Sequence, residues 1–151
     1  MITILCISDS DKHFALACEE YIKRLGKNVN IINLKPSKKD TASEIIKQDT
    51  QSIISKINSG IAKNNQIILL CKGGKNRTTE EWQLYIEKHN NQSQDMCFII
   101  WGPYGLDEAL VPYHECLSFA AITMPHGLAK LVLLEQIYRC KQITEGRNYH
   151  Y

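Results

Sequence analysis

Glycines follow three successive apolar segments of this chain. They are Gly73 and Gly74 after residues 66–71, Gly102 and Gly105 after residues 96–101, and Gly127 after residues 117–124. Glycine lets the backbone turn sharply and approach a ligand closely, so three such turns could line one binding pocket. Each glycine taken alone is more typical of an ordinary tight turn. Their recurrence at the ends of three segments favours a shared pocket.

Basic side chains flank these glycines in two groups. The first group is Lys72, Lys75 and Arg77, and the second is Lys130, Arg139, Lys141 and Arg147. Lysine and arginine neutralise phosphates, so the two groups together predict a surface that contacts RNA. For each residue alone, a solvated basic face is the simpler interpretation.

The first apolar segment, residues 2–7, lacks a glycine turn. It is followed by residues 8–11 with the sequence SDSD. The Rossmann fingerprint of dinucleotide enzymes and ordinary methyltransferases is therefore absent. A flavodoxin-like nucleotide-binding domain is disfavoured for the same reason, because no phosphate-binding loop follows this segment.

Apolar, β-branched runs alternate along the chain with segments of helical periodicity. We expect strands at residues 2–7, 29–34, 66–71, 96–101 and 117–124. We expect helices at residues 12–25, 41–58, 79–90, 106–115 and 128–145, and Thr78 with Glu81 has the spacing of a capping box. This alternation predicts one α/β domain over residues 1–151 with a largely parallel sheet. Ligands bind such sheets beyond the carboxyl ends of the strands, where the glycine turns fall.

The last of these helices is apolar around nearly its whole circumference. Its apolar residues are Leu128, Leu131, Val132, Leu133, Leu134, Ile137, Tyr138, Cys140 and Ile143. Such a helix must be covered on more than one side. One face can pack on the sheet and another on a second copy of the chain, so we expect a homodimer. A fully buried helix in a monomer is the alternative.

Size and charge set limits on the class of protein. The chain has 151 residues, and its 18 basic and 16 acidic residues leave a formal charge of +2. Affinity for nucleic acid must therefore come from local clusters. No apolar stretch reaches the ~18 residues that a membrane span needs, and the amino terminus lacks a basic leader. We expect a soluble, cytoplasmic protein that does not contact membranes.

Six cysteines are scattered along the chain, at positions 6, 18, 71, 97, 116 and 140. They form neither a C-x-x-C pair nor a cluster with zinc spacing. In the absence of a secretory signal we expect reduced, mostly structural thiols and no bound metal, with a disulfide as the less favoured alternative.

A longer set of motifs becomes recognisable toward the carboxyl end. The motifs are Gly102-Pro103-Tyr104-Gly105-Leu106, Leu117-Ser118-Phe119, Thr123-Met124-Pro125-His126, Leu134-Glu135-Gln136-Ile137-Tyr138-Arg139 and Asn148-Tyr149-His150-Tyr151. In order and spacing they resemble the ribosomal RNA large-subunit methyltransferase H family of the SPOUT class. The resemblance covers essentially the whole chain, including residues 21–26 (YIKRLG), and is most specific in the last fifty residues.

The resemblance implies a fold, a cofactor and a substrate. The fold is a SPOUT-type α/β knot, in which a parallel sheet carries helices on both faces and the carboxyl-terminal segment forms a deep trefoil knot. General rules of chain topology would not predict that knot. The family also implies a homodimer that binds S-adenosyl-L-methionine in a bent shape. Its substrate is N3 of a pseudouridine in an intersubunit stem-loop of 23S ribosomal RNA, on the assembled ribosome.

The family's cofactor pocket can be carried over onto three segments of this chain. It maps onto Leu70, onto the turn that contains Trp101, Gly102 and Gly105, and onto Phe119, Ala120, Ala121, Ile122, Thr123 and Met124. These residues would act through backbone groups and apolar walls around the adenine, as is usual in cofactor pockets.

Three residues are candidates for the proton transfer that the family's reaction requires. Most of the acceleration should come from holding the methyl donor and the nitrogen in a near-attack geometry. The imide N3–H must still lose a proton, and His126, Tyr149 and His150 are the candidate bases. His126 could instead be a hydrogen-bonding residue of its turn, and His150 a frayed terminus. The closing Tyr-His pair of the family favours a catalytic role across the dimer.

Three positions depart from the family's pattern. Trp101 stands where a glycine is usual, Cys71 replaces an acidic residue, and Lys130 replaces an arginine, keeping the charge but losing the planar fork. An indole at Trp101 either narrows the pocket or points away from it. Trp101 and Cys71 therefore motivate a second hypothesis, a ribosome-binding or assembly module that has kept the fold and lost catalysis.

Overall fold

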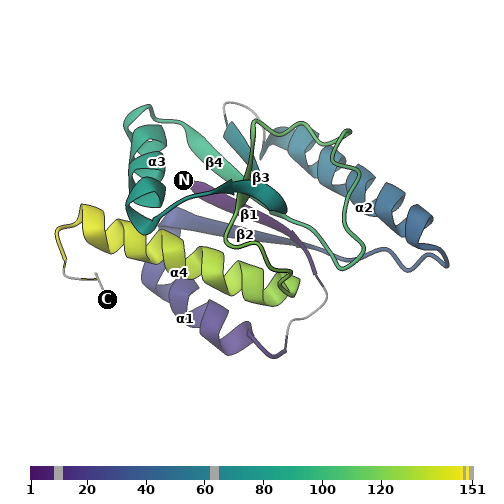
Figure 1. Cartoon of the computed structure of the whole chain (residues 1–151), viewed down its shortest axis with the longest axis horizontal. Coiled ribbons are helices and arrows are strands. Elements are labelled where there is room, and N and C mark those ends of the chain that lie inside the picture. Colours follow the sequence, from purple (N-terminus) through teal and green to yellow (C-terminus); the bar gives the residue numbers. More distant parts are fainter. Residues whose placement is uncertain (9–11, 62–64, 148, 150–151) are drawn as a thin grey trace.

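The computed structural model describes residues 1–8, 12–61, 65–147 and 149. A five-stranded sheet forms the middle layer, in the order β2-β1-β4-β3-β5, and every neighbouring pair is parallel (Figure 1). The strands are β1 (Ile2–Ile7), β2 (Val29–Leu34), β3 (Asn65–Asn76), β4 (Asp95–Ile100) and β5 (Glu115–Ser118). All five strands therefore end at the same edge of the sheet.

Helices cover both faces of this sheet, as the sequence predicted. The helices α1 (Ala15–Leu25), α3 (Thr79–Asn91) and α4 (His126–Thr144) pack on one face, and α2 (Ala42–Lys56) lies on the other (Figure 1). A short 3-10 turn (Gly26–Asn28) follows α1, and a π turn (Ile57–Ile61) follows α2. The α/β fold class is confirmed, whereas the knot stays a prediction.

The alternation of side chains along the strands divides the core in two. On β1, Ile4 and Cys6 belong to the cluster beneath α1, α3 and α4, while Leu5 and Ile7 belong to the cluster beneath α2. Successive residues of a strand point to opposite faces, so a strand covered on both sides must be apolar throughout. This is why the central strands read as unbroken apolar runs.

The predicted capping box is present at the start of α3. The Glu81 amide donates to the Thr78 hydroxyl at 3.2 Å, and the Thr78 amide donates to the Glu81 carboxylate at 2.8 Å. Helix α2 begins similarly, since the side chain of Thr41 accepts from the Glu44 amide at 3.3 Å. These local hydrogen bonds fix where each helix begins.

The helix predicted at residues 106–115 is wrong. The segment between β4 and β5 forms isolated turns, with hydrogen bonds from the Leu110 amide to Asp107 and from the Val111 amide to Glu108. Pro112 has no amide hydrogen and disfavours helical geometry in the residue before it. The apolar spacing of this segment instead serves packing, because Val111 is buried in the cluster beneath α2.

Two strand boundaries also differ from the prediction. The strand predicted at residues 117–124 ends at Ser118, where the Ser118 hydroxyl donates to the Ala120 carbonyl oxygen at 2.9 Å and the chain turns away. The strand β3 is longer than predicted. Leu70 and Lys75 both lie opposite Leu117, so residues 71–74 form a bulge before pairing resumes.

Candidate cofactor site and the carboxyl-terminal network

A cavity of about 760 Å³ opens beyond the carboxyl ends of β4 and β5, beside residues 70–72 of β3. Its walls contain every residue that the resemblance assigned to the cofactor except Ala121, which does not line it. Those residues are Leu70, Trp101, Gly102, Gly105, Phe119, Ala120, Ile122, Thr123 and Met124. Of the glycines that suggested a shared pocket, Gly102 and Gly105 line the cavity, whereas Gly73, Gly74 and Gly127 do not. Neighbours of the latter, such as Lys72 and His126, do line it, because parallel strands deliver the loops that follow them to one edge.

Several further residues line the cavity that the sequence did not single out for the cofactor. They are Cys71, Lys72, Ile100, Pro103, Tyr104, Leu117, Ser118, Pro125 and Ala129. Most of them directly precede or follow a predicted position, so they could have been predicted from their proximity in the sequence. The resulting wall is mainly apolar with a few polar groups, which is the usual character of a small-molecule site.

Position 102 favours glycine because its backbone packs tightly against Ile7 and Asp49. A Cβ atom there would lie 3.1 Å from Cγ2 of Ile7 and 3.7 Å from Oδ2 of Asp49. The turn is closed by a hydrogen bond from the Gly105 amide to the Gly102 carbonyl oxygen at 3.1 Å. Gly105 has a φ of 85°, a left-handed conformation that favours glycine.

The indole of Trp101 does not close the cavity. Trp101 is half-buried, packs against the apolar cluster beneath α2, and also lines the cavity. On the opposite wall the ring of Phe119 stacks on Trp82 of α3, with ring centroids 5.7 Å apart. Packing in the core therefore fixes both rings, Trp101 against the cluster beneath α2 and Phe119 against Trp82, while the cavity stays open.

Gly74 allows the bulge of β3 to lie against β5. A Cβ atom at this position would lie 2.5 Å from the carbonyl carbon of Leu117 and 2.8 Å from that of Cys116. Neighbouring Gly73 has open space around its own Cβ position. Only Gly74 is therefore required by close approach of two backbones.

The prediction that the cysteines are reduced thiols is wrong for one pair. Cys71 of β3 and Cys116 of β5 form a disulfide, with Cα atoms 6.2 Å apart. Strand pairing brings them together across a sequence separation of 45 residues, which no spacing motif could reveal. Cys6, Cys18, Cys97 and Cys140 are buried thiols. Burial raises the pKa of the Cys97 and Cys140 thiols to about 12, as is typical of unreactive structural cysteines.

Of the two candidate bases that the structure describes, His126 and Tyr149, only His126 lies at the cavity. It is the first residue of α4 and lines the cavity wall. Tyr149 lies beside Arg139, thirteen residues further along α4, which corresponds to about 20 Å of helix. His150 lies outside the described residues. Within one chain, the structure therefore does not bring Tyr149 to the cavity that His126 lines.

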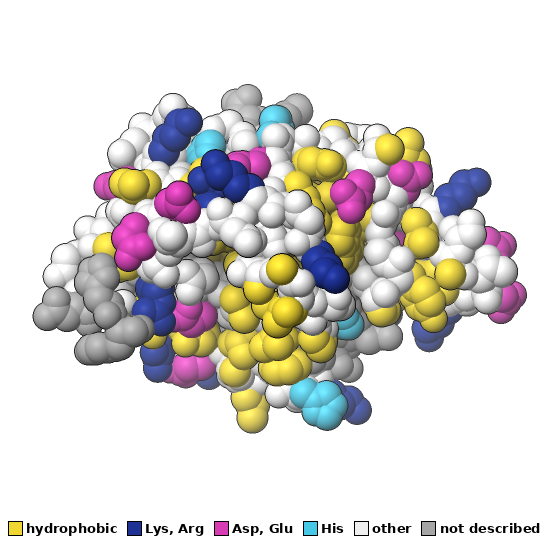
Figure 2. Space-filling model, viewed as in Figure 1, with side chains coloured by type: hydrophobic (Ala, Val, Ile, Leu, Met, Phe, Trp, Pro, Cys, Tyr) yellow, Lys and Arg dark blue, Asp and Glu magenta, His cyan; other side chains and the backbone are white. Residues whose placement is uncertain are grey.

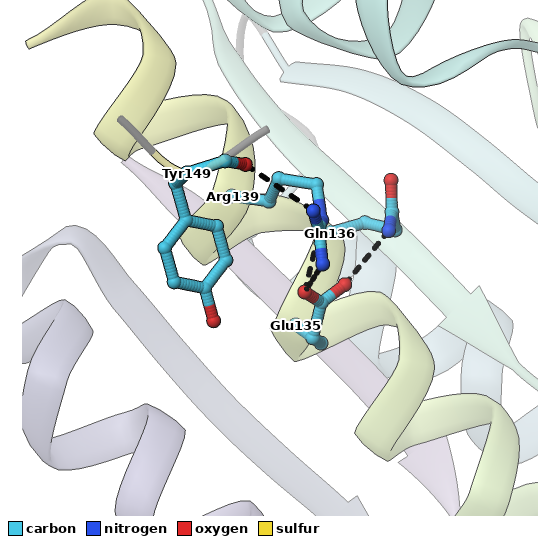
Figure 3. A network of polar contacts seen from close by, with 4 residues as sticks. All are labelled: Glu135, Gln136, Arg139 and Tyr149. Carbon is cyan, nitrogen blue, oxygen red and sulfur yellow. Dashed lines mark hydrogen bonds and ion pairs between the residues drawn. The ribbon is translucent and has the colours of Figure 1, made fainter. Parts of the chain in front are cut away.

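Tyr149 belongs to a network on the carboxyl-terminal half of α4 (Figure 3). Arg139 donates to Glu135 at 2.6 Å and to the Tyr149 carbonyl oxygen at 3.2 Å, and its guanidinium lies 4.9 Å from the Tyr149 ring centroid. Tyr149 also packs edge-on against Tyr138, which contacts Tyr21 of α1 in the same way. Burial, followed by the neighbouring Tyr149 hydroxyl, raises the pKa of Tyr21.

The seven predicted RNA-binding residues do not share one surface environment. Lys72 is exposed on the bulge of β3, and Lys75 is exposed directly after it, where pairing with β5 resumes. Arg77 pairs with Glu115 at 2.5 Å, and Arg139 pairs with Glu135. Lys130 is only 8% exposed. Closer to the carboxyl end, Lys141 and Arg147 lie 3.8 and 3.5 Å from Glu145.

The described parts of the chain contain neither a cluster of metal ligands nor a membrane-spanning helix. Residues 1–8, 12–61, 65–147 and 149 contain no group of three or more His, Cys, Asp or Glu side chains that could hold a metal ion. Within the same residues, no helix is long and apolar enough to cross a membrane.

Comparison with known proteins identifies the family. The family described as "Predicted SPOUT methyltransferase" matches residues 1–150. This chain belongs to the SPOUT methyltransferase family. The resemblance drawn from the carboxyl-terminal motifs is thereby confirmed. In this SPOUT protein, the cavity lies at the strand ends where the family resemblance placed the methyl-donor site.

Three relatives carry the name "Ribosomal RNA large subunit methyltransferase H". The protein of Mycoplasmopsis pulmonis is 31% identical over 151 residues, covering 99% of this SPOUT chain and 98% of the relative. That of Clostridium novyi is 37% identical over 159 aligned positions, with coverage of 99% and 98%. That of Thermotoga maritima is 28% identical over 146 residues, with coverage of 96% and 91%. The similarity therefore extends over both chains almost from end to end.

Proposed function

We propose that this protein is an S-adenosyl-L-methionine-dependent methyltransferase of 23S ribosomal RNA. Its proposed substrate is N3 of a pseudouridine in the intersubunit stem-loop of the assembled ribosome, in the cytoplasm. The observation that carries the proposal is the cavity itself, which gathers the strand-end residues assigned to the cofactor in a chain of this family. Full-length similarity to relatives named as large-subunit methyltransferases supports the choice of RNA.

The cavity suits the methyl donor in size and chemistry. Its volume of about 760 Å³ falls within the roughly 300–1,000 Å³ of ordinary ligand pockets. Leu70, Phe119 and Met124 offer apolar walls to an adenine, while the turn at Gly102 and Gly105 brings backbone groups close. When bound, the cofactor supplies a methyl group activated by its sulfonium.

The chain's contribution to the reaction is orientation and one proton transfer. Walls fixed by packing, such as Phe119 stacked on Trp82, hold reactants in a near-attack geometry. His126 at the cavity wall is our first candidate to accept the N3 proton. Tyr149 remains a candidate only if a second chain contributes it, because it packs far from the cavity of its own chain. His150, outside the described residues, stays a candidate.

A homodimer would bring such a tail into place. Hydrophobic side chains gather over the amino-terminal half of α4, on the face shown in Figure 2. Leu128, Leu131 and Val132 are only half-buried there, and Ile122 is 64% exposed beside the cavity. A second copy of the chain would cover these residues and complete the site.

The test is methyl transfer to ribosomes that lack the modification. Purified protein, labelled S-adenosyl-L-methionine and such ribosomes should label 23S RNA at a single pseudouridine, located by nuclease mapping. Already modified ribosomes are the control and should take up no label. Absence of transfer to both, together with no measurable cofactor binding, would refute the proposal.

The hypothesis of a degenerate, non-catalytic module gains no support from Trp101, because the cavity beside it remains open. Calorimetric titration with S-adenosylhomocysteine separates the two hypotheses. We expect ordinary micromolar binding. A protein that binds ribosomes but not S-adenosylhomocysteine would instead favour the non-catalytic module.

A further inference from the structure

Helix α2 buries two adjacent polar residues beneath the cavity. Its buried face consists of Ile45, Asp49, Thr50 and Ile53, with Asp49 only 2% and Thr50 only 1% exposed. Isoleucines at such positions serve the core, but a buried carboxylate and hydroxyl cost free energy unless they make specific hydrogen bonds. The partners of these two side chains therefore indicate what they do.

Thr50 bonds the loop that forms one wall of the cavity, whereas Asp49 accepts its hydrogen bond from the Ser37 amide at 2.8 Å and only approaches this loop. We call residues 101–107 the cofactor loop, since five of them, Trp101, Gly102, Pro103, Tyr104 and Gly105, line the cavity. The Thr50 hydroxyl accepts a hydrogen bond from the Asp107 amide at 2.9 Å, at the end of this loop. At its start, Oδ2 of Asp49 lies 3.7 Å from the position of a Cβ atom on Gly102.

The cofactor loop has no helix or strand hydrogen bonds to hold it. In the described part of the chain, its internal backbone bond joins Gly105 to Gly102. The loop therefore depends on what it packs against, which is Ile7 of β1 at one point and helix α2 at the other. A loop seated at both ends on rigid elements keeps its backbone in one geometry.

We propose that Thr50 is a positioning residue for the methyl donor, acting through the cofactor loop. This inference rests on the proposed function, because it assigns the cavity to that donor. Thr50 does not line the cavity and touches no reacting atom. Its hydroxyl fixes the Asp107 amide and with it the wall formed by Trp101 to Gly105.

The decisive variants change the hydroxyl and little else. Thr50→Val keeps the shape of the side chain and removes the acceptor, whereas Thr50→Ser keeps the acceptor. Ser52→Ala is the matched control, because the Ser52 hydroxyl donates to the Gln48 carbonyl oxygen inside α2 and makes no contact with the loop. Melting temperatures confirm that each variant is folded.

We expect Thr50→Val to raise KM for S-adenosyl-L-methionine by about threefold to tenfold, the worth of one hydrogen bond, with kcat within twofold of wild type. Thr50→Ser should restore KM, and Ser52→Ala should not change it. If the role of Thr50 were purely structural, Thr50→Val would lower the melting temperature without raising KM relative to kcat. A Thr50→Val enzyme with wild-type KM would overturn the proposal.

Hydrogen exchange tests the anchoring without any ligand. Amides of residues 101–107 should exchange faster in Thr50→Val than in wild type or Ser52→Ala; equal rates would overturn the proposal. Thr50→Ala is a second variant, and failure of both to fold would assign Thr50 to stability alone and also overturn it. Wild-type protein that binds no S-adenosylhomocysteine, but whose loop exchange still depends on Thr50, would refute the proposed function while leaving the anchoring intact.

Discussion

Lys72 and Lys75 differ from the other basic residues near the cavity. Both are exposed, Lys72 on the bulge of β3 and Lys75 directly after it, and Lys72 also lines the cavity. Arg77 and Arg139 make close ion pairs with glutamates, which reduces the charge they offer to a phosphate. Lys130 is buried in α4. At the scale of single residues, Lys72 and Lys75 are therefore the best candidates for phosphate contacts.

The double variant Lys72→Gln with Lys75→Gln should weaken binding to 23S RNA. Each lost phosphate contact should reduce the slope of log K against log salt by about 0.7–0.9, so we expect a total change of up to about 2. Because Lys72 also lines the cavity and Lys75 does not, Lys75→Gln alone should leave the affinity for S-adenosylhomocysteine unchanged. Filter binding at several salt concentrations measures the slope.

The control is Lys23→Gln with Lys27→Gln. These lysines are equally exposed but lie where α1 leads into the start of β2, at the opposite edge of the sheet. If this control reduced the slope as much as the variant of Lys72 and Lys75, these two lysines would have no special role in RNA binding.

Asp49 should make stability depend on pH. Burial raises its pKa above the ordinary value of 3.8, although the Ser37 amide donates to its carboxylate at 2.8 Å. The folded chain therefore binds more protons than the unfolded chain, so protonation of Asp49 stabilises the fold. This stabilisation is greatest below the pKa of Asp49 in the unfolded chain and is lost as pH rises through its pKa in the folded chain.

Asp49→Asn keeps an acceptor for the Ser37 amide and removes the titration. From about pH 4 to about pH 7, the wild-type melting temperature should fall relative to that of Asp49→Asn. Thermal denaturation of both proteins over this range measures the difference. Parallel pH profiles would show that Asp49 has the same pKa in the folded and unfolded chain.

At the scale of elements, the contact between β3 and β5 shapes the cavity. The bulge at residues 71–74 interrupts the pairing of these strands and supplies Cys71 and Lys72 to the cavity wall. The Cys71–Cys116 disulfide and the close approach of Gly74 to Leu117 both hold the bulge against β5. The shape of the cavity therefore depends on the close approach of the β3 and β5 backbones.

Gly74→Ala should destabilise the fold by about 1–3 kcal/mol, because its Cβ atom would overlap backbone atoms of Leu117 and Cys116, which cannot move as a side chain can. Gly73→Ala, one residue earlier and in open space, should stay within about 0.5 kcal/mol of wild type. Urea denaturation of the two variants measures both effects. Equal stability would show that the bulge relaxes around the new methyl group.

At the scale of the whole molecule, one chain places its cavity and its tail at different ends of α4. His126 opens the helix at the cavity, while Arg139 holds Tyr149 near the other end. A catalytic role for Tyr149 requires a second chain. The half-buried apolar residues on α4 provide a surface on which such a chain could dock.

Mixing two inactive variants tests this arrangement. One chain ends at Arg147 and lacks the tail, and the other carries Ala120→Trp, which fills the cavity from a loop. If the tail acts on the partner's cavity, each mixed dimer contains one complete site, formed by the cavity of the truncated chain and the tail of the Ala120→Trp chain. After an equal mixture of the two variants is refolded, methyl transfer should therefore recover to about a quarter of the wild-type rate. If mass spectrometry detects mixed dimers but methyl transfer does not recover, the tail of one chain does not act at the cavity of its partner.

The sequence by itself determined what depends on neighbours along the chain. Residues 2–7 and 29–34 are strands as predicted, and Thr78 with Glu81 begins α3 as a capping box. Apolar, β-branched runs and capping pairs are local signals, so composition and spacing along the chain report them directly. The motifs around Gly102 and Phe119 likewise identified most of the cavity wall, because each lies just after a strand.

The tertiary structure decided what depends on residues far apart in the sequence. Thr50 meets Asp107, and Cys71 meets Cys116, only because the sheet brings their elements together. The pairing of Arg139 with Glu135, at helical i,i+4 spacing, could have been found in the sequence. The burial of Lys130 could not, because it depends on which side of an all-round apolar helix faces the core.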